Sequence, residues 1–250
     1  MSASAAADIV VIARRDLSRN LRQRNQWLGA VARPAVWLLI LGAGLGTGRS
    51  ADFISGYSYR QFTFPGIVVM GILFSGIMSG ASIVWDREFG FLKEIRIAPV
   101  ARTSILVGKL LAGTLLSLLQ GIAAFLFFPF IGIGMTPLKI FLSLLCMAIT
   151  GTLATSIGIL LAGFVKTIEG FGNVNNLLAM PLFALSGAVY PLSGAPEWLK
   201  RVAYFDPFTY AVNLMRNAVL DVGAYPIADI AGLLLLTFMF LAAAYLRLDL

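Results

Sequence analysis

The chain has 250 residues, of which 59% are hydrophobic and only 12% are charged, about half the charged share of an ordinary soluble domain. A soluble fold could not keep that much apolar surface out of water, so the composition excludes a purely soluble protein. Histidine is absent and Cys146 is the single cysteine, which excludes an intrachain disulfide and argues against a His/Cys metal site.

The N-terminal stretch, residues 8–28, predicts an amphipathic helix lying in the cytoplasmic membrane interface. Apolar side chains recur on one helical face, and basic side chains gather on the opposite face: Val10, Ala13, Leu17 and Leu21 against Arg15, Arg19 and Arg22. A second interpretation, in which these arginines serve only to fix the topology, is compatible with the first and stays open.

Six segments are long and apolar enough to be candidate membrane spans, each of which needs about 20 residues. They cover residues 34–48, 62–85, 105–133, 138–165, 173–192 and 227–246. If the N-terminus is cytoplasmic, most of the 19 Lys and Arg residues fall on the cytoplasmic side. The positive-inside rule therefore predicts both termini in the cytoplasm, and it accounts for the net charge of +7 without nucleic acid.

The densest charge cluster is the connection 86–102 between the second and third predicted spans. As a helix ending before Pro99, it would place Phe91, Leu92 and Ile95 on one apolar stripe among acidic and basic side chains. An exposed apolar stripe favours a docking surface whose mixed charges fix its register; the alternative is a solvated loop with topogenic charges. The residues assigned to docking are Arg87, Glu88, Phe89, Gly90, Phe91, Leu92, Glu94, Ile95 and Arg96.

Residues 193–226 form a separate segment before the last predicted span. Within it, one apolar face carries Phe208, Val212, Met215 and Val219, opposite Asn213, Arg216 and Asn217. About 14 helical residues reach only about 21 Å, too short for a hydrocarbon core of about 30 Å. We therefore predict a helix on the outer leaflet or one that re-enters it partway.

The predicted spans carry no Asp, Glu, Lys or Arg away from their ends, which argues against coupling to an ion gradient. The chain also has no phosphate-binding loop, because Gly108–Lys109 is followed by Leu110 and has no upstream glycine. No nucleophile–base pair is evident, so we expect no catalysis and an energy source in another polypeptide. Polar groups at depth are hydroxyls and amides, and the candidate translocation path is Ser75, Ser79, Asn175 and Asn176.

Two blocks of motifs resemble the bacterial ABC-2 type permeases, which include daunorubicin-type drug exporters and nodulation-factor exporters. The first block comprises Phe64–Gly66, Arg87–Gly90, Ile97–Val100 and Gly108–Lys109. The second comprises Leu185–Leu192, Pro196, Trp198–Leu199 and Pro207–Tyr210. The blocks occur in the family's order, and the resemblance extends from the N-terminal helix to the last span.

The resemblance implies a single all-α integral membrane domain over residues 1–250. This domain would have six transmembrane helices, an N-terminal interface helix, a cytoplasmic coupling helix at about 87–98 and short re-entrant extracytoplasmic helices at about 196–220. The residues marking the re-entrant segment are Pro191, Trp198, Pro207 and Tyr210.

The resemblance also implies partners: a separate ATPase subunit that binds ATP and Mg²⁺, a second permease copy of the same or another chain, and membrane lipids. The expected location is the bacterial plasma (inner) membrane. The expected function is export of an amphipathic, lipid-linked or drug-like substrate, and the absence of histidine argues against haem. Two alternatives stay open: a stand-alone secondary transporter or channel, and a membrane anchor for a cytoplasmic partner.

Overall fold

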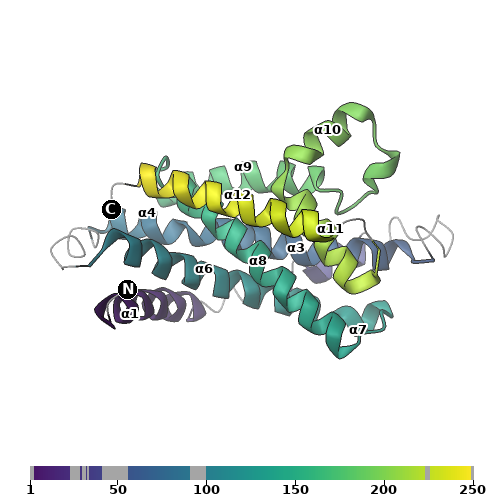
Figure 1. Ribbon diagram of the computed structural model, residues 1–250, viewed down its shortest axis with the longest axis horizontal. Helices are drawn as coiled ribbons and strands as arrows, with labels where there is room; N and C mark the ends of the chain where they lie inside the picture. Colours follow the sequence, from purple (N-terminus) through teal and green to yellow (C-terminus); the bar gives the residue numbers. More distant parts are fainter. Residues whose placement is uncertain are drawn as a thin grey trace.

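The structure is a computed structural model that describes residues 3–22, 29, 32, 34–40, 56–90, 100–222 and 226–248. The elements of these ranges are helices gathered along one long axis (Figure 1), which confirms the all-α prediction. They are α1 (Ala3–Leu21), α3 (Tyr59–Ser79), α4 (Ala81–Glu88), α6 (Arg102–Phe125), α7 (Phe128–Ile131), α8 (Pro137–Ala162), α9 (Ile168–Leu185), the 3-10 turn η1 (Leu192–Gly194), α10 (Glu197–Phe205), α11 (Pro207–Leu220) and α12 (Pro226–Arg247).

Four helical stretches among the described residues are long and apolar enough to cross a membrane: Tyr59–Glu88, Arg102–Ile131, Pro137–Ala162 and Ile227–Arg247. They coincide with four of the six predicted spans. α9 occupies much of the predicted span 173–192, but with 18 residues and three asparagines it is shorter and more polar than these four. Of the predicted span 34–48, residues 34–40 are helical and the rest lies outside the described residues.

Several helices begin where the sequence supplies a polar cap. The side chains of Thr136, Thr167 and Asp206 accept hydrogen bonds from backbone N–H groups in the first turns of α8, α9 and α11. At the start of α3, Ser58 and Gln61 form a reciprocal capping box. These caps satisfy amides that a helix leaves without an intrahelical partner, so they fix where each helix starts.

Small residues bring α3 and α8 into close contact. A Cβ atom on Gly80 would collide with the backbone of Gly158, and one on Gly76 would collide with Ala154. Gly80 is also the junction at which α3 gives way to α4. The small-xxx-small pair Gly76/Gly80 therefore packs two helices of one chain together, as small residues do in membrane helix interfaces.

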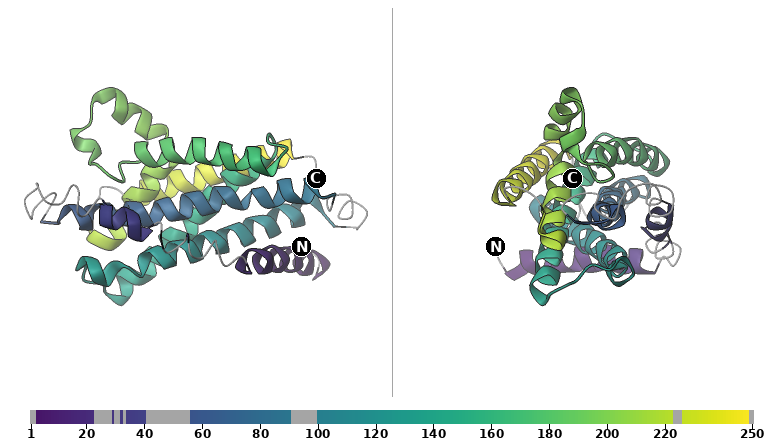
Figure 2. Two further views of the ribbon diagram at one scale, coloured as in Figure 1. Left: turned by 180° about the vertical axis from the view of Figure 1, so that it is seen from behind. Right: turned by 90° about the vertical axis from the view of Figure 1, so that its right-hand side faces the viewer.

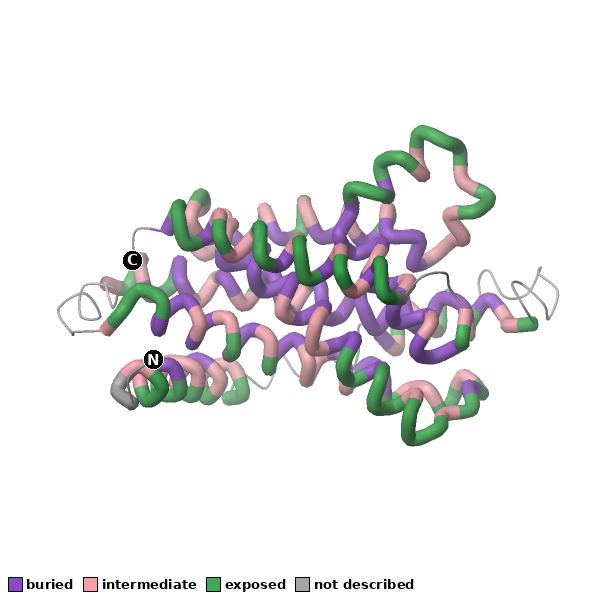
Figure 3. Tube along the Cα trace, viewed as in Figure 1, coloured by how far each residue is buried: buried purple, intermediate pink, exposed green. Residues whose placement is uncertain are grey.

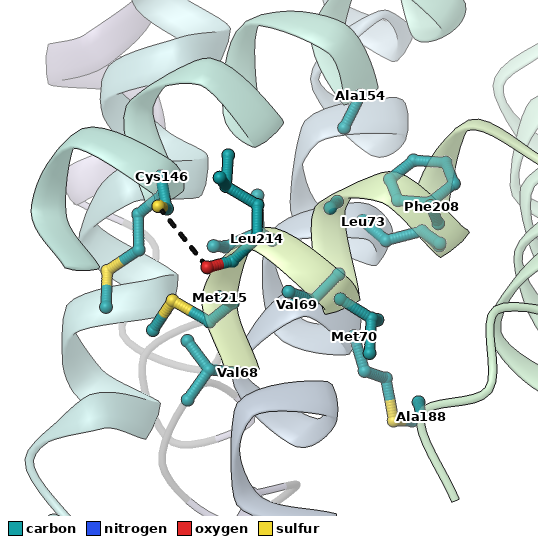
Figure 4. Close-up of a cluster of buried hydrophobic side chains, with 14 of the residues drawn as sticks. Val68, Val69, Met70, Leu73, Cys146, Ala154, Ala188, Phe208, Leu214 and Met215 are labelled. Carbon is teal, nitrogen blue, oxygen red and sulfur yellow. Dashed lines mark hydrogen bonds between the residues drawn. The ribbon is translucent and has the colours of Figure 1, made fainter. Parts of the chain in front are cut away.

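Helix α11 is buried within the bundle, where it packs on α3, α8 and α12. The predicted apolar face is confirmed, since Phe208, Val212, Met215 and Val219 are all fully buried. Figure 3 shows buried positions along the central helices, and Figure 4 shows α11 side chains among those of α3 and α8, with the Cys146 thiol directed at the Leu214 carbonyl. At 14 residues, α11 has the predicted length and does not cross the bundle from end to end.

Arg216 belongs to the face of α11 that was predicted to be polar, and this face is enclosed as well. Its guanidinium is buried, donates a hydrogen bond of 3.0 Å to the Gly187 carbonyl and lies 4.0 Å from the centre of the Phe62 ring. The segment after α9 and the start of α3 surround α11 at this point. The helix predicted to lie on the outer leaflet or to re-enter it is therefore also enclosed at Arg216, on its polar side.

The N-terminal helix α1 lies across the bundle rather than along it. Figure 2 (right) shows α1 lengthwise where the long helices are seen close to end-on. This direction agrees with the predicted interface helix. Val10 and Leu21 of the predicted apolar face are exposed, whereas Ile9 and Asp16 are buried, and contact of the exposed face with lipid stays a prediction. Helix α1 packs on α6 through Ile9 and turns its charged side toward other charges in the bundle.

Candidate functional site

A cluster of five charged side chains joins α1, α4 and α6. The Lys109 Nζ atom lies 2.7 Å from an oxygen of Asp16 and 2.5 Å from one of Asp86. Arg15 contacts the same two carboxylates at 2.9 and 2.6 Å, and Arg19 lies 3.6 Å from Asp86. Three cations thus surround two carboxylates, and the cluster carries one net positive charge.

The buried members of this cluster depend on one another. The side chain of Lys109 is only 3% exposed, and it also contacts the Ser82 hydroxyl at 3.2 Å. Burial alone would raise the pKa of Asp16, but the charge and hydrogen bond of Lys109, and then those of Arg15, hold it below its usual value. Asp16 is therefore ionised in the folded protein at neutral pH.

Sequence reasoning missed this cluster. It used Lys109 to reject a phosphate-binding loop and as part of a family motif, did not use Asp16, and placed Arg15 and Arg19 on the basic face of an interface helix. The available signals were a lysine inside an apolar helix, at Gly108–Lys109, and an acidic residue, Asp86, at the end of a predicted span. Neither signal shows which distant residue would neutralise the other.

Beside the cluster lies a cavity of about 950 Å³. It is bounded by α3, α4, α6 and α9, by Arg19 and Asn20 of α1, and by Gly29 and Trp37. All four residues predicted for the translocation path line it: Ser75, Ser79, Asn175 and Asn176. The structure brings them together, while their role in translocation stays a prediction.

The lining of the cavity changes along its length. Arg19, Ser82 and Trp85 lie at the end next to the charge cluster, and hydroxyl and amide side chains such as Ser79 follow on α3 and α9. Met70 on α3 belongs to the opposite end, where Phe74, Trp37 and Met180 are apolar and Gln120 of α6, level with Gly71, adds one amide. Asn175 is 5% exposed, and its side-chain oxygen is buried without a hydrogen-bond partner.

The residues predicted for docking are divided by the end of α4. Helix α4 ends at Glu88, and Gly90 has a φ of 79°, so Arg87 and Glu88 close a spanning helix rather than open a coupling helix. Arg87 donates hydrogen bonds to the Ala162 and Val165 carbonyls at 3.1 and 3.4 Å. Phe89 is exposed beyond the helix end. The remaining predicted docking residues, Phe91, Leu92, Glu94, Ile95 and Arg96, lie outside the described residues.

The other side of α4 contacts the start of α9. Glu88 accepts a hydrogen bond of 3.2 Å from the backbone N–H of Ile168. Ile168 begins α9, which carries Asn175 and Asn176 to the cavity. The first residues of the connection 86–102 are thereby linked, through α9, to the wall of the cavity.

The predicted re-entrant segment consists of short helices. Pro191 precedes η1, Trp198 is exposed on α10, and Pro207 is the buried first residue of α11. The Tyr210 hydroxyl donates to the Tyr204 carbonyl at 2.8 Å, which ties α11 to α10. Figure 1 shows α10 standing away from the bundle.

Asp206 lies between α10 and α11 and caps α11. Its side chain accepts a hydrogen bond of 2.9 Å from the Phe208 N–H. Burial raises the pKa of Asp206 to about 7, although the hydrogen bonds from Phe208 and Thr209 oppose this rise. The cap is therefore close to its titration point at neutral pH.

Long apolar helices packed around a buried half-length helix define a polytopic membrane protein. The chain belongs to the ABC-2 type transporter family, whose model matches residues 7–220. The resemblance noted from the motifs is therefore confirmed. The chain is a membrane permease of a family that generally works with a separate ATPase subunit.

Individual relatives show the same relationship. The chain is similar to the ycf38 protein of Cyanophora paradoxa, with 31% identity over 219 residues that cover 84% of this chain and 73% of that one. It shares 27% identity over 229 residues with the inner membrane transport permease YadH of Escherichia coli K12, covering 88% and 86% of the two chains. Nodulation protein J of Azorhizobium caulinodans is 25% identical over 198 residues, which cover 78% of this chain and 76% of that one.

Proposed function

We propose that the chain is the membrane subunit of an ATP-driven exporter for an amphipathic, lipid-linked or drug-like cargo. The observation that carries this proposal is the cavity of about 950 Å³ with a graded polar and apolar lining. Its volume is at the upper end of the range for sites that enclose a drug-sized ligand, about 300–1,000 Å³. Its position among spanning helices suits a cargo that enters from the membrane or its surface.

A separate ATPase subunit would drive the exporter through the connection 86–102. Nucleotide binding would move this connection, and the connection would move the end of α4. Because Glu88 contacts the N-terminus of α9 and Arg87 contacts the end of α8, that movement is passed to helices that bound or support the cavity. The cavity would then change between inward- and outward-facing states as nucleotide shifts their populations.

A second permease copy, identical or related, would cover the open side of the cavity. Asn176, Leu177 and Met180 are exposed on α9 at this side, and such a side chain set suits either lipid or a facing helix. We assign the protein to a bacterial inner membrane with both termini in the cytoplasm. The two ends of the chain lie at the same end of the bundle, where Arg102 of α6 donates to the Leu248 carbonyl and α1 packs on α6.

The test is transport by the permease together with its ATPase in inside-out vesicles, with an NBD-labelled phospholipid as the reporter. Gly172→Trp fills the cavity, since a Cβ at Gly172 meets open space. Leu235→Trp is the matched control on an exposed position of α12. We expect Gly172→Trp to abolish ATP-dependent accumulation and Leu235→Trp to preserve it. Equal transport by both variants, or gradient-driven transport by the permease alone, would refute the proposal.

A further inference from the structure

The cation excess beside the cavity points to the charge of the cargo. We propose that the cavity binds amphiphiles with an anionic end at Arg19, a hydroxyl- or amide-bearing middle at Asn175 and an apolar tail toward Met70. This inference rests on the proposed function, because it specifies the cargo of the same cavity.

Arg19 is the cation of the cluster that is available to a ligand. Lys109 is 3% exposed and contacts both carboxylates within 2.7 Å, and Arg15 contacts both within 2.9 Å. Arg15 and Arg19 are equally exposed, at 32% and 31%, but Arg19 is held only at 3.6 and 4.0 Å and is the one of the two that lines the cavity. The net positive charge of the cluster is therefore presented to the cavity through the Arg19 guanidinium, which suits phosphate and carboxylate groups.

Among the described lining residues, no side chain would attract a cationic cargo as Arg19 attracts an anionic one. It includes no Asp or Glu side chain, and the nearby carboxylates of Asp16 and Asp86 are already surrounded by cations. The indole of Trp85 lies 5.7 Å from the Arg19 guanidinium, so this ring is also engaged by a cation. Charge alone therefore favours an anion at this end of the cavity.

Asn175 supplies a second contact of defined chemistry. Its side-chain oxygen is buried, lacks a hydrogen-bond partner and belongs to a residue that lines the cavity. A buried acceptor without a donor is costly, and a ligand hydroxyl or N–H would satisfy it once the side chain turns this oxygen toward the cavity. The middle of the cargo should therefore carry a hydrogen-bond donor.

The dimensions agree with a single-chain amphiphile. Trp85 and Met70 are 15 residues apart along α3 and α4, which corresponds to about 22 Å at 1.5 Å per residue. An anionic head, a short polar linker and a tail of about a dozen carbons fit this length. The apolar end, with Met70, Phe74 and Met180, is the place for the tail.

The probe for this inference is lysophosphatidic acid with a photoactivatable acyl chain, which has a phosphate, a glycerol hydroxyl and one tail. Lysophosphatidylcholine and an alkyltrimethylammonium with the same photoactivatable tail give the zwitterionic and cationic comparisons. The full chain is reconstituted in phosphatidylcholine nanodiscs, and half-saturation of cross-linking to α3 and α9 is measured. We expect lysophosphatidic acid to saturate the cavity at a concentration about tenfold lower than either comparison.

Variants assign the preference to residues. Arg19→Gln should remove the preference and Arg19→Lys should keep most of it, whereas Arg14→Gln, an exposed charge change on the same helix, should have no effect. Asn175→Leu should weaken binding of lysophosphatidic acid several-fold, but not of an analogue lacking the glycerol hydroxyl. If a variant fails to fold, the comparison of the three probes on the unaltered chain still tests the charge preference.

The outcomes separate this inference from the proposed function. If all three probes saturate equally and Gly172→Trp blocks all of them, the cavity holds cargo without charge selection, and the inference is overturned while the proposed function stands. A preference for the cationic probe likewise overturns only the inference. If no probe cross-links within the cavity and Gly172→Trp transports normally, both are overturned.

Discussion

Replacing Lys109 by Met removes the cation that lies between the carboxylates of Asp16 and Asp86. Both carboxylates are as buried as Lys109, with 3–4% side-chain exposure, and they would then be left facing each other. Deleting one partner of a buried ion pair costs about 3–5 kcal/mol of folding free energy. Arg15 still contacts both carboxylates, so we expect the lower end of this range, about 3 kcal/mol.

The measurement is unfolding of the purified chain in mild detergent by titration with SDS. Lys139→Met is the matched control: its ammonium lies 2.6 Å from Asp221, but that carboxylate is 72% exposed. A surface pair of this kind contributes about 0–1 kcal/mol. Combining Lys109→Met with Asp86→Asn should recover part of the loss, by about 1–2 kcal/mol, because the second change removes one of the two buried carboxylates that Lys109 had separated. If Lys109→Met costs no more than Lys139→Met, the cluster does not hold α1, α4 and α6 together.

Three further predictions concern other positions. Gly80→Ala should destabilise the chain by about 1–3 kcal/mol in the same titration, because the new methyl group collides with the backbone of α8. The control, Gly172→Ala, places its methyl group in open space and should be neutral or slightly stabilising. Arg216→Ala should lower the free energy of unfolding by about 2–4 kcal/mol, because it leaves a cavity and removes the contact with the Phe62 ring. The same change at the exposed Arg201 should lower it by less than about 0.5 kcal/mol, and equal effects of the two changes would refute this prediction. For Asp206, the folded state binds the proton more tightly than the unfolded state, so stability should fall between pH 4 and about 7 and level off above. The slope, at most about 1.4 kcal/mol per pH unit, should disappear in Asp206→Asn, which retains the cap; a slope unchanged in that variant would contradict the assignment.

Length and apolar period were enough to predict most of the architecture. The spans at 62–85 and 138–165 correspond to helices within a few residues, and the half-length helix at α11 follows from proline positions and a run too short to cross a membrane. These features are local, because the number of residues and their spacing decide them. They therefore do not require knowledge of neighbouring helices.

Features that depend on distant residues could not be predicted in the same way. For α1 and α11, the sequence pattern separated apolar from polar faces, but it could not show that Asp16 and Arg216 are buried against partners more than 25 residues away in the chain. The four path residues do line one cavity, because polar side chains inside apolar helices tend to be turned away from lipid. The unpartnered oxygen of Asn175 and the cation excess at Arg19 emerge only once the helices are assembled.

The central position of α11 has a consequence for how the protein is made. Its 14 residues cannot cross a bilayer, yet they complete the packing of α3, α8 and α12. During synthesis, α3 and α8 leave the ribosome long before α11, and the site that it fills between them must stay vacant or be occupied by lipid. Final packing of the early helices therefore waits until about residue 220 has been translated, and a chain stalled before that point would be exposed to quality-control proteases as an open bundle.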